Sequence, residues 1–396
     1  MEPTMPPPLT LRPWQVICAG ISALVLSVGI ARFAYTPLLP LMRVDAGLSP
    51  AMGGWLATFN YVGYLLGTLL VARVGDMRLK FRFYRVGLLL AVTSTALMAV
   101  TTTPALWSAL RLVAGLSSTA GLLLASGLVL NWLLAHRHRP RLGLHFAGLG
   151  LGIVVSGVAT GLLAGHATSS AQWGWLGVVG ALFLIPAWAW MPAPAPASSA
   201  QAATAPAPPS RRWRQLLIAA YFCAGIGFVV SATFIVAILE QTPAFRGHGS
   251  AVWILVGLAA VPSTFAWDRV AAALGLIRAL MLAFALQAAS FVLPLLDDGL
   301  WAGLGSALLF GLTFAGIVNL TLTVIGRHYP QNPAKAMATL TLSYGVAQIL
   351  APAIAGTLAR SSGSYQASLL LAAIAMTVGI FLLAAMPDDA RDHASH

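Results

Sequence analysis

The chain has 396 residues, of which 59% are hydrophobic and 8% are charged, and its mean hydropathy is +0.84. Soluble domains carry about 25% charged residues, so this composition excludes a soluble fold and predicts a membrane protein with many spans. The net charge of +12 is concentrated in short segments between apolar stretches. Such clustering is typical of membrane orientation, and we therefore expect no nucleic-acid partner.

Twelve apolar stretches of helix length follow one another along the chain. In lipid such stretches must be helical, because every backbone polar group has to be paired within its own segment. The sequence therefore predicts an all-α polytopic protein of the lipid bilayer with 12 transmembrane helices. They cover residues 14–41, 51–72, 83–101, 105–131, 142–166, 172–191, 214–240, 250–267, 277–296, 300–326, 336–359 and 366–386.

Positive charge alternates between successive loops. Seventeen of the 22 lysines and arginines lie in one set of alternate loops together with the two ends of the chain, and three lie in the other set. The remaining two, Arg32 and Arg111, lie inside apolar stretches. Because cytoplasmic loops carry the excess of Lys and Arg, this pattern predicts that both termini are cytoplasmic.

The segment from Pro192 to Ser210 has no charge and consists mainly of Pro, Ala and Ser. This composition is typical of an extended, solvated linker, and it leaves six spans on each side. The tetrapeptide Cys-Ala-Gly-Ile occurs in the first span of each half, at 18–21 and 223–226. We expect an N-terminal bundle at 1–191, a cytoplasmic linker at 192–212 and a C-terminal bundle at 213–396, an arrangement that transporters use.

Four local patterns resemble motifs of the major facilitator superfamily. They are Arg111-Leu-Val-Ala-Gly115 in the fourth span, Gly67 to Asp76 after the second, Trp267-Asp268-Arg269 after the eighth, and Gly29 to Pro40 in the first. The last of these is similar to the first-helix signature of the YbfB/YjiJ-like branch. In the second pattern Ala72 stands where the superfamily has an acid. The resemblance implies the major facilitator fold and secondary transport in the bacterial inner membrane, and it implies no particular substrate.

Arg32 is the most informative residue, because a charge near the bilayer centre costs about 2.5–3.5 kcal/mol on insertion scales. On its helix it shares a stripe with Gly29, Tyr35 and Thr36, which are small or polar. Arg111 is expected at a similar depth, and none of the ten acids lies deep in a span. A substrate carboxylate would neutralise these cations, so the pattern predicts an anion-binding site.

Other roles for these arginines stay open. Arg111 can be structural and bond backbone carbonyls, and Arg32 can pair with Glu240 or reach toward the outer water. The candidate substrate-binding residues are Arg32, Tyr35, Asn60, Tyr64, Arg111, Asn319, Tyr344 and Gln348. Glu240 and His145 are candidates for proton coupling, because both can change charge.

The fifth span contains three Gly-x-x-x-Gly patterns, beginning at Gly148, Gly157 and Gly161. Such spacing lets helices approach closely. In the fold implied by the resemblance, this helix packs at the interface between the two halves, and we expect it there.

No His-Glu-x-x-His, P-loop or Gly-x-Ser-x-Gly pattern is present. We therefore expect no enzymatic activity, no cofactor and no metal site. The favoured function is secondary transport of a small organic anion by alternating access, by a monomer, with proton coupling as an option. Two alternatives stay open: a proton-driven exporter of drugs or metabolites, and a non-transporting membrane sensor or assembly partner.

Overall fold

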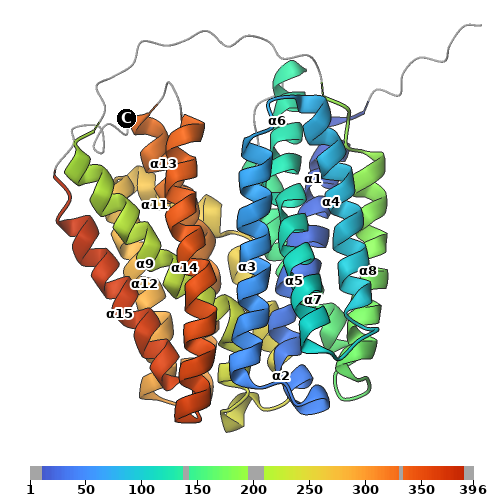
Figure 1. Ribbon diagram of the computed structural model, residues 1–396. Coiled ribbons are helices and arrows are strands. Elements are labelled where there is room, and N and C mark those ends of the chain that lie inside the picture. The colour runs from blue at the N-terminus through green and yellow to red at the C-terminus, as the bar shows by residue number, and fades with distance from the viewer. Residues whose placement is uncertain (1–10, 137–141, 195–208, 330–332, 388–396) are drawn as a thin grey trace, which may run out of the picture.

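The computed structural model describes residues 11–136, 142–194, 209–329 and 333–387, and the regular structure within these ranges is helical (Figure 1). The helices run roughly side by side along one long axis and gather into two groups. We name the two ends of this axis by the helices that finish there: the α2 end, at the bottom of Figure 1, and the α6 end, at the top.

The first group follows the first half of the chain. Its opening span is a continuous run of 34 residues in which a π-helical stretch separates two α-helices. The elements are α1 (Pro13–Leu24), η1 (Val25–Phe33), α2 (Tyr35–Ala46), α3 (Pro50–Ala72), α4 (Met77–Leu97), α5 (Pro104–Thr119), η2 (Ala120–Ala125), α6 (Ser126–Ala135), α7 (Leu142–Gly161) and α8 (Ser169–Ala189).

The second group begins after the stretch that contains the predicted linker, of which residues 195–208 lie outside the described part of the chain. Its elements are α9 (Arg211–Leu239), η3 (Pro243–Phe245), α10 (Gly249–Ala260), α11 (Ser263–Leu274), α12 (Leu276–Leu296), α13 (Leu300–His328), α14 (Pro333–Ser362) and α15 (Gln366–Ala384).

Within the described residues, ten helices are long and apolar enough to cross a membrane, or 11 when α10 and α11 count as one bent span. The predicted continuous span at 250–267 is wrong in this respect, because the chain bends by 43° between α10 and α11. Pro262 stands at that break and has no N–H to continue the helix. The predicted span at 83–101 corresponds to α4, whose first turns carry Arg78, Lys80 and Arg82, so its composition falls short of a membrane span.

Glycines set the closest helix contacts. A Cβ atom on Gly115 of α5 would lie 1.8 Å from the carbonyl oxygen of Asn60, and one on Gly63 of α3 would lie 1.9 Å from that of Leu112. The α3 and α5 backbones therefore touch, which places the side chain of Asn60 against the backbone of α5. This seam fixes the position of α3 relative to the helix that carries Arg111.

Two further seams join the first group to the second. Gly54 of α3 lies against the Pro352 carbonyl of α14, and Gly157 of α7 lies against Ile254 of α10. The expectation that the glycine-rich fifth span packs between the halves is confirmed, because α7 runs along α10.

Hydrogen bonds between the groups occur in the part of the molecule toward the α2 end. The Thr58 hydroxyl donates to the Ile349 carbonyl at 2.8 Å, and the Thr36 hydroxyl donates to the Ala232 carbonyl. The Trp253 indole donates to Ser156 at 3.1 Å. These bonds hold the two groups together near the start of α3 and the end of α7.

The α3–α5 seam predicts an asymmetric response to two alanine substitutions. Gly115→Ala forces a methyl group into the Asn60 backbone and should lower the free energy of unfolding by about 1–3 kcal/mol. Gly127→Ala is the matched control, because a Cβ there meets no atom within 4 Å. Thermal unfolding in detergent should show a lower Tm for Gly115→Ala, whereas equal Tm values for the two variants would contradict this account of the seam.

Candidate substrate site around Arg32

The site is built on the π-helical stretch η1. A π-helix shifts the backbone hydrogen bonds from four residues to five and is often found at functional sites. Carbonyls of η1 accept hydrogen bonds from α5: Arg111 donates through Nη1 to Ala31 at 3.0 Å and through Nη2 to Arg32 at 3.1 Å, and the Ser118 hydroxyl donates to Ser27 at 3.2 Å. Side chains of α5 thus satisfy backbone carbonyls of the π-helical stretch η1 and stabilise it.

Arg111 is therefore engaged at the backbone of the first span. Its side chain is 3% exposed, and its guanidinium also lies over the ring of Tyr35, with Cζ 4.5 Å from the ring centroid. The Tyr35 hydroxyl in turn donates to the Gly53 carbonyl at 2.8 Å. These contacts favour the structural role of Arg111 that the sequence left open, and they tie Tyr35 to the same framework.

Arg32 has a different environment. It is 4% exposed, and its Cζ lies 4.6 Å from the ring centroid of Tyr61 and 4.5 Å from that of Tyr64, both on α3. The Tyr61 hydroxyl also interacts with Arg32 and with Thr233 of α9. The Arg32 Nε atom is buried and has no hydrogen-bond partner among the described residues. Two aromatic faces thus surround a cation that still has a free donor.

Carboxylates stand elsewhere in the described part of the chain, which contains six of the ten acids. Five of these six accept hydrogen bonds, four of them at or near helix ends and one, Asp268, within α11, and the sixth, Asp298, is exposed before α13. The five are Asp45, which accepts from Ser169, Asp76 from Arg78, Glu240 from Gly249, Asp268 from Asn319, and Asp297 from Gly299. The pairing of Arg32 with Glu240 that the sequence allowed is not formed.

Three other predicted residues lie on the helices α3 and α14. The Asn60 side chain donates to the Arg111 carbonyl at 2.9 Å, and its Oδ1 is buried without a partner in the described structure. Tyr344 of α14 lies within electrostatic range of Arg32, Tyr61 and Tyr64. One turn further along α14, Gln348 has a buried Oε1 atom that lacks a partner among the described residues.

Two predicted residues, Asn319 and His145, lie away from Arg32 and its aromatic neighbours. Asn319 of α13 donates to Asp268 of α11 at 2.7 Å, a contact within the second group. His145 of α7 is fully buried, with its Nε2 2.8 Å from the Ser126 hydroxyl and its ring packed on Gly20. Neither contact brings the side chain to Arg32.

Glu240 lies at the α2 end, just after α9. Together with Arg43 and Gln241 it lines a cavity of about 350 Å³ between the ends of α2 and α9. Burial raises the pKa of the Glu240 carboxyl, and the hydrogen bond from the Gly249 N–H, at 3.0 Å, opposes this effect. Glu240 therefore belongs to the contact between the groups near this end and is separate from the aromatic site of Arg32.

Tyr221 of α9 belongs to the site and was missed as a binding candidate. Its ring stacks on Tyr344 with centroids 4.5 Å apart and planes at 24°. The ring of Phe228 also lies beside Tyr344, with centroids 5.8 Å apart. The available signal was the position of Tyr221 in the seventh span, which lines the central cavity in the fold that the resemblance implies. Tyr221 and Tyr344 give the second group a share of the surface around Arg32.

The comparisons with known proteins agree with this architecture. The family described as "Uncharacterised MFS-type transporter YbfB" matches residues 24–384. The chain belongs to this family. It is therefore a transporter of the major facilitator type, not an enzyme, and the resemblance seen in the sequence is confirmed.

Solved structures agree on the fold. Two crystal structures of the nucleoside transporter NupG, the first of a mutant, are similar with TM-scores of 0.75 and 0.73 and sequence identities of 13% and 14%. Each covers 94% of this chain, and the chain covers 100% and 98% of theirs. Among curated proteins, none matches the chain significantly.

The different environments of the two arginines predict opposite effects on stability. Arg111→Gln leaves at least one η1 carbonyl without its donor, which costs about 1–3 kcal/mol, so Tm should fall. Arg32→Gln removes a buried cation that has no carboxylate partner, so Tm should stay level or rise. Thermal unfolding of the ligand-free proteins tests both, and an Arg111→Gln protein as stable as the wild type would contradict the structural role.

Proposed function

We propose that this transporter moves a small organic anion of the carboxylate type across the bacterial inner membrane by alternating access, with Arg32 as its principal binding residue. The observation that carries the proposal is the buried Arg32 guanidinium, whose Nε has no partner and which no described carboxylate neutralises. A guanidinium fork binds a carboxylate through two parallel charge-assisted hydrogen bonds.

The energetics support an incoming anion. Burying an ion costs several kcal/mol even after relaxation, and a desolvated cation–π contact returns about 2 kcal/mol. The rings of Tyr61 and Tyr64 therefore offset part of the cost of burying Arg32. Arg111 lies within electrostatic range and adds a second positive charge. A bound anion would reduce the repulsion between the two guanidinium groups.

The proposal includes 12 spans, with α4 as the third, in a bundle at 1–191 and a bundle at 213–396 joined by a cytoplasmic linker. We further propose that the chain works as a monomer with both termini in the cytoplasm, which the alternation of positive charge supports. The α6 end then faces inward. Because the hydrogen bonds between the groups lie toward the α2 end, we infer a conformation closed to the outside.

The rival proposals make different demands. An exporter of cationic drugs needs an acid near the substrate, whereas Glu240 and Asp268 bond Gly249 and Asn319, away from Arg32. A neutral nucleoside, the class named for NupG, would leave the charge of Arg32 uncompensated. A resistance panel in a host without its own pumps separates drug export from anion transport, and a sensor or assembly partner would show no flux in either assay.

Arg32 variants test the proposal directly. A thermal-shift screen of the wild type against mono- and dicarboxylates, nucleosides and cationic dyes should select carboxylates, because a ligand at 100 times its Kd stabilises the folded state by about 2.7 kcal/mol. In vesicles, uptake of the selected carboxylate should be lost in Arg32→Gln. Arg32→Lys should bind roughly 10- to 100-fold more weakly, since a charge-assisted hydrogen bond contributes about 1.5–3 kcal/mol.

The control is Arg82→Gln, which removes an equal charge from an exposed position on α4. This variant should transport as the wild type does. Wild-type uptake by both Arg32 variants would show that Arg32 does not bind the anion. A screen that selects nucleosides or dyes and no carboxylate would reject the proposed substrate class.

Proton coupling through Glu240 predicts a specific pH dependence. A Glu side chain titrates near pH 4.3 when unfolded, and burial raises the pKa of Glu240 in the folded protein. The folded state then binds the proton more tightly, so stability falls as pH rises from about 4.3 through the raised pKa. Glu240→Gln should remove this loss, whereas Asp298→Asn, at an exposed acid, should keep it.

Two measurements address this coupling. Tm values between pH 4 and pH 8 should converge for wild type and Glu240→Gln at low pH and separate at high pH, with the variant the more stable. Transport of the selected anion should lose its dependence on an imposed pH gradient in Glu240→Gln. Unchanged gradient dependence would exclude Glu240 as the proton carrier and would leave the role of Arg32 intact.

A further inference from the structure

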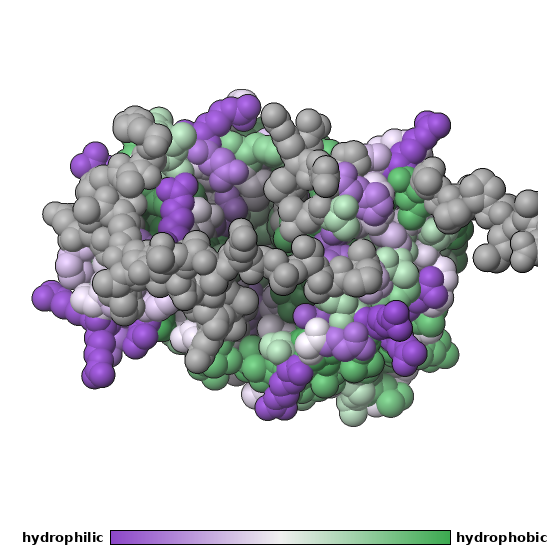
Figure 2. Space-filling model, turned by 90° about the horizontal axis from the view of Figure 1, so that it is seen from above, coloured by the Kyte–Doolittle hydropathy of each residue, from purple (hydrophilic) through white to green (hydrophobic). Residues whose placement is uncertain are grey.

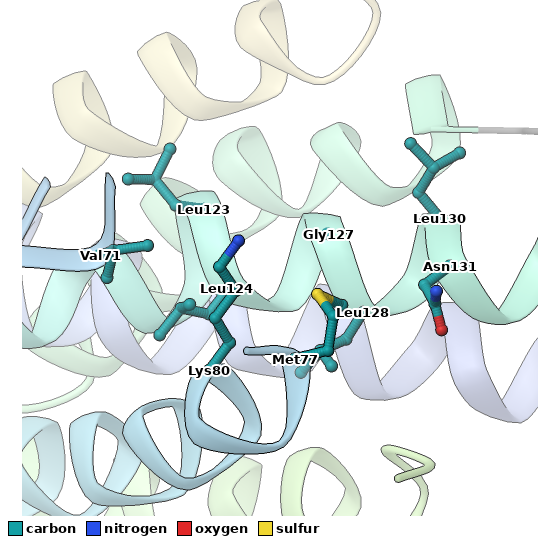
Figure 3. A pocket seen from close by; sticks show the side chains of 9 residues that line it. All are labelled: Val71, Met77, Lys80, Leu123, Leu124, Gly127, Leu128, Leu130 and Asn131. Carbon is teal, nitrogen blue, oxygen red and sulfur yellow. The ribbon is translucent and has the colours of Figure 1, made fainter. Parts of the chain in front are cut away.

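A second cavity lies in the first group, away from Arg32 (Figure 3). Its volume is about 270 Å³, and its walls come from the end of α3, the start of α4, η2 and α6. We call it the α4 groove; its lining residues are Val71, Met77, Lys80, Leu123, Leu124, Gly127, Leu128, Leu130 and Asn131.

The groove combines a long apolar wall with two polar groups. Figure 3 shows Lys80 reaching from α4 toward the η2–α6 helix, with Asn131 farther along that helix and Val71 and Leu123 at the opposite end. Leu123 and Asn131 are eight residues apart, which is about 12 Å along a helix. The groove is therefore amphipathic along its length.

Among the described residues, Asn131 Oδ1 has no hydrogen-bond donor and the groove lining contains no acid that could pair with Lys80. The Asn131 Oδ1 atom is buried and has no hydrogen-bond partner among the described residues. Lys80 is the charged residue in the lining, and no acid shares the wall with it. The nearest acid in sequence, Asp76, caps α4 by accepting from the N–H groups of Arg78 and Leu79 at 3.0 and 3.3 Å.

The groove is also open where a ligand would enter. Gly127 in its lining is exposed, and a Cβ atom added there would meet no atom of a neighbouring element within 4 Å. The α6 end toward which the groove leads carries many hydrophilic side chains, with apolar residues along the flank below (Figure 2). Hydrophilic residues beside apolar ones are expected where a membrane protein passes from the lipid headgroups to the acyl chains.

We propose that the α4 groove binds one anionic phospholipid of the surrounding bilayer. The phosphate pairs with the Lys80 ammonium, a headgroup hydroxyl donates to Asn131 Oδ1, and an acyl chain covers Leu123, Leu124 and Gly127. Basic pockets between membrane helices bind anionic headgroups in this way. Each buried CH₂ of the chain adds about 0.8 kcal/mol, which holds the lipid after the headgroup has docked.

The experiment measures lipid binding by native mass spectrometry of the full chain with dioleoylphosphatidylglycerol and dioleoylphosphatidylcholine. The wild type should retain one phosphatidylglycerol at a concentration at least fivefold lower than phosphatidylcholine. Lys80→Gln should remove this preference, whereas Arg82→Gln, two residues from it in sequence and outside the groove, should keep it. Gly127→Leu, at a position where an added Cβ meets no neighbouring atom within 4 Å, places a larger side chain in the groove and should abolish retention of both lipids.

Any of three results would overturn the proposal. The first is a phosphatidylglycerol preference that is unchanged in Lys80→Gln, and the second is lipid retention that is unchanged in Gly127→Leu. The third is full competition by glycerol phosphate, which has the headgroup chemistry and no acyl chain, because it would show that the groove binds a soluble anion. The readout is independent of transport, so it stands or fails separately from the role of Arg32.

Discussion

The hydrogen bonds from Arg111 to the carbonyls of Ala31 and Arg32 hold the backbone on which the site is built. A π-helical stretch of nine residues is unfavourable by itself, because its backbone bonds are spaced more widely than those of an α-helix. The guanidinium of Arg111 satisfies two carbonyls of this stretch at once. One buried cation therefore works as a structural clamp, and it leaves the neighbouring Arg32 side chain directed toward Tyr61 and Tyr64.

Close helix contacts at glycines connect Arg111 to the other residues around Arg32. Because Gly115 and Gly63 bring the α3 and α5 backbones into contact, the two tyrosines that face Arg32 are placed by the same helix pair that carries Arg111. Gly54 then ties α3 to α14, the helix that contributes Tyr344. The surface around Arg32 thus takes side chains from both groups of helices, and a relative movement of the groups would alter it.

Hydropathy alone predicted the helical spans, because lipid forces long apolar stretches into helices. The family was predicted from local motifs such as Arg111-Leu-Val-Ala-Gly115 that resemble it. The hydropathy signal gave wrong helix boundaries at two places, where a helix begins among charged residues or bends within an apolar stretch. The helix α4 begins at Met77 among charged residues, so an apolar window starts six residues late. The bend at Pro262 depends on a single residue within an apolar stretch. Asn319 was predicted to bind substrate because it is a polar residue in an apolar span. In the structure its side chain donates to Asp268 instead.

The candidate site was predictable in its charge and less so in its aromatic walls. Arg32 stands out because a charge in an apolar span is rare, whereas a tyrosine such as Tyr221 is common in a membrane helix and its stacking on Tyr344 depends on two distant segments. The first span also supplies Thr36, one turn beyond Arg32, whose hydroxyl bonds the Ala232 carbonyl of α9. One continuous run of helix therefore carries both the anchoring cation and a contact between the groups. Under the proposal that Arg32 binds an anion, the anion contacts the same helical run that bonds α9 through Thr36.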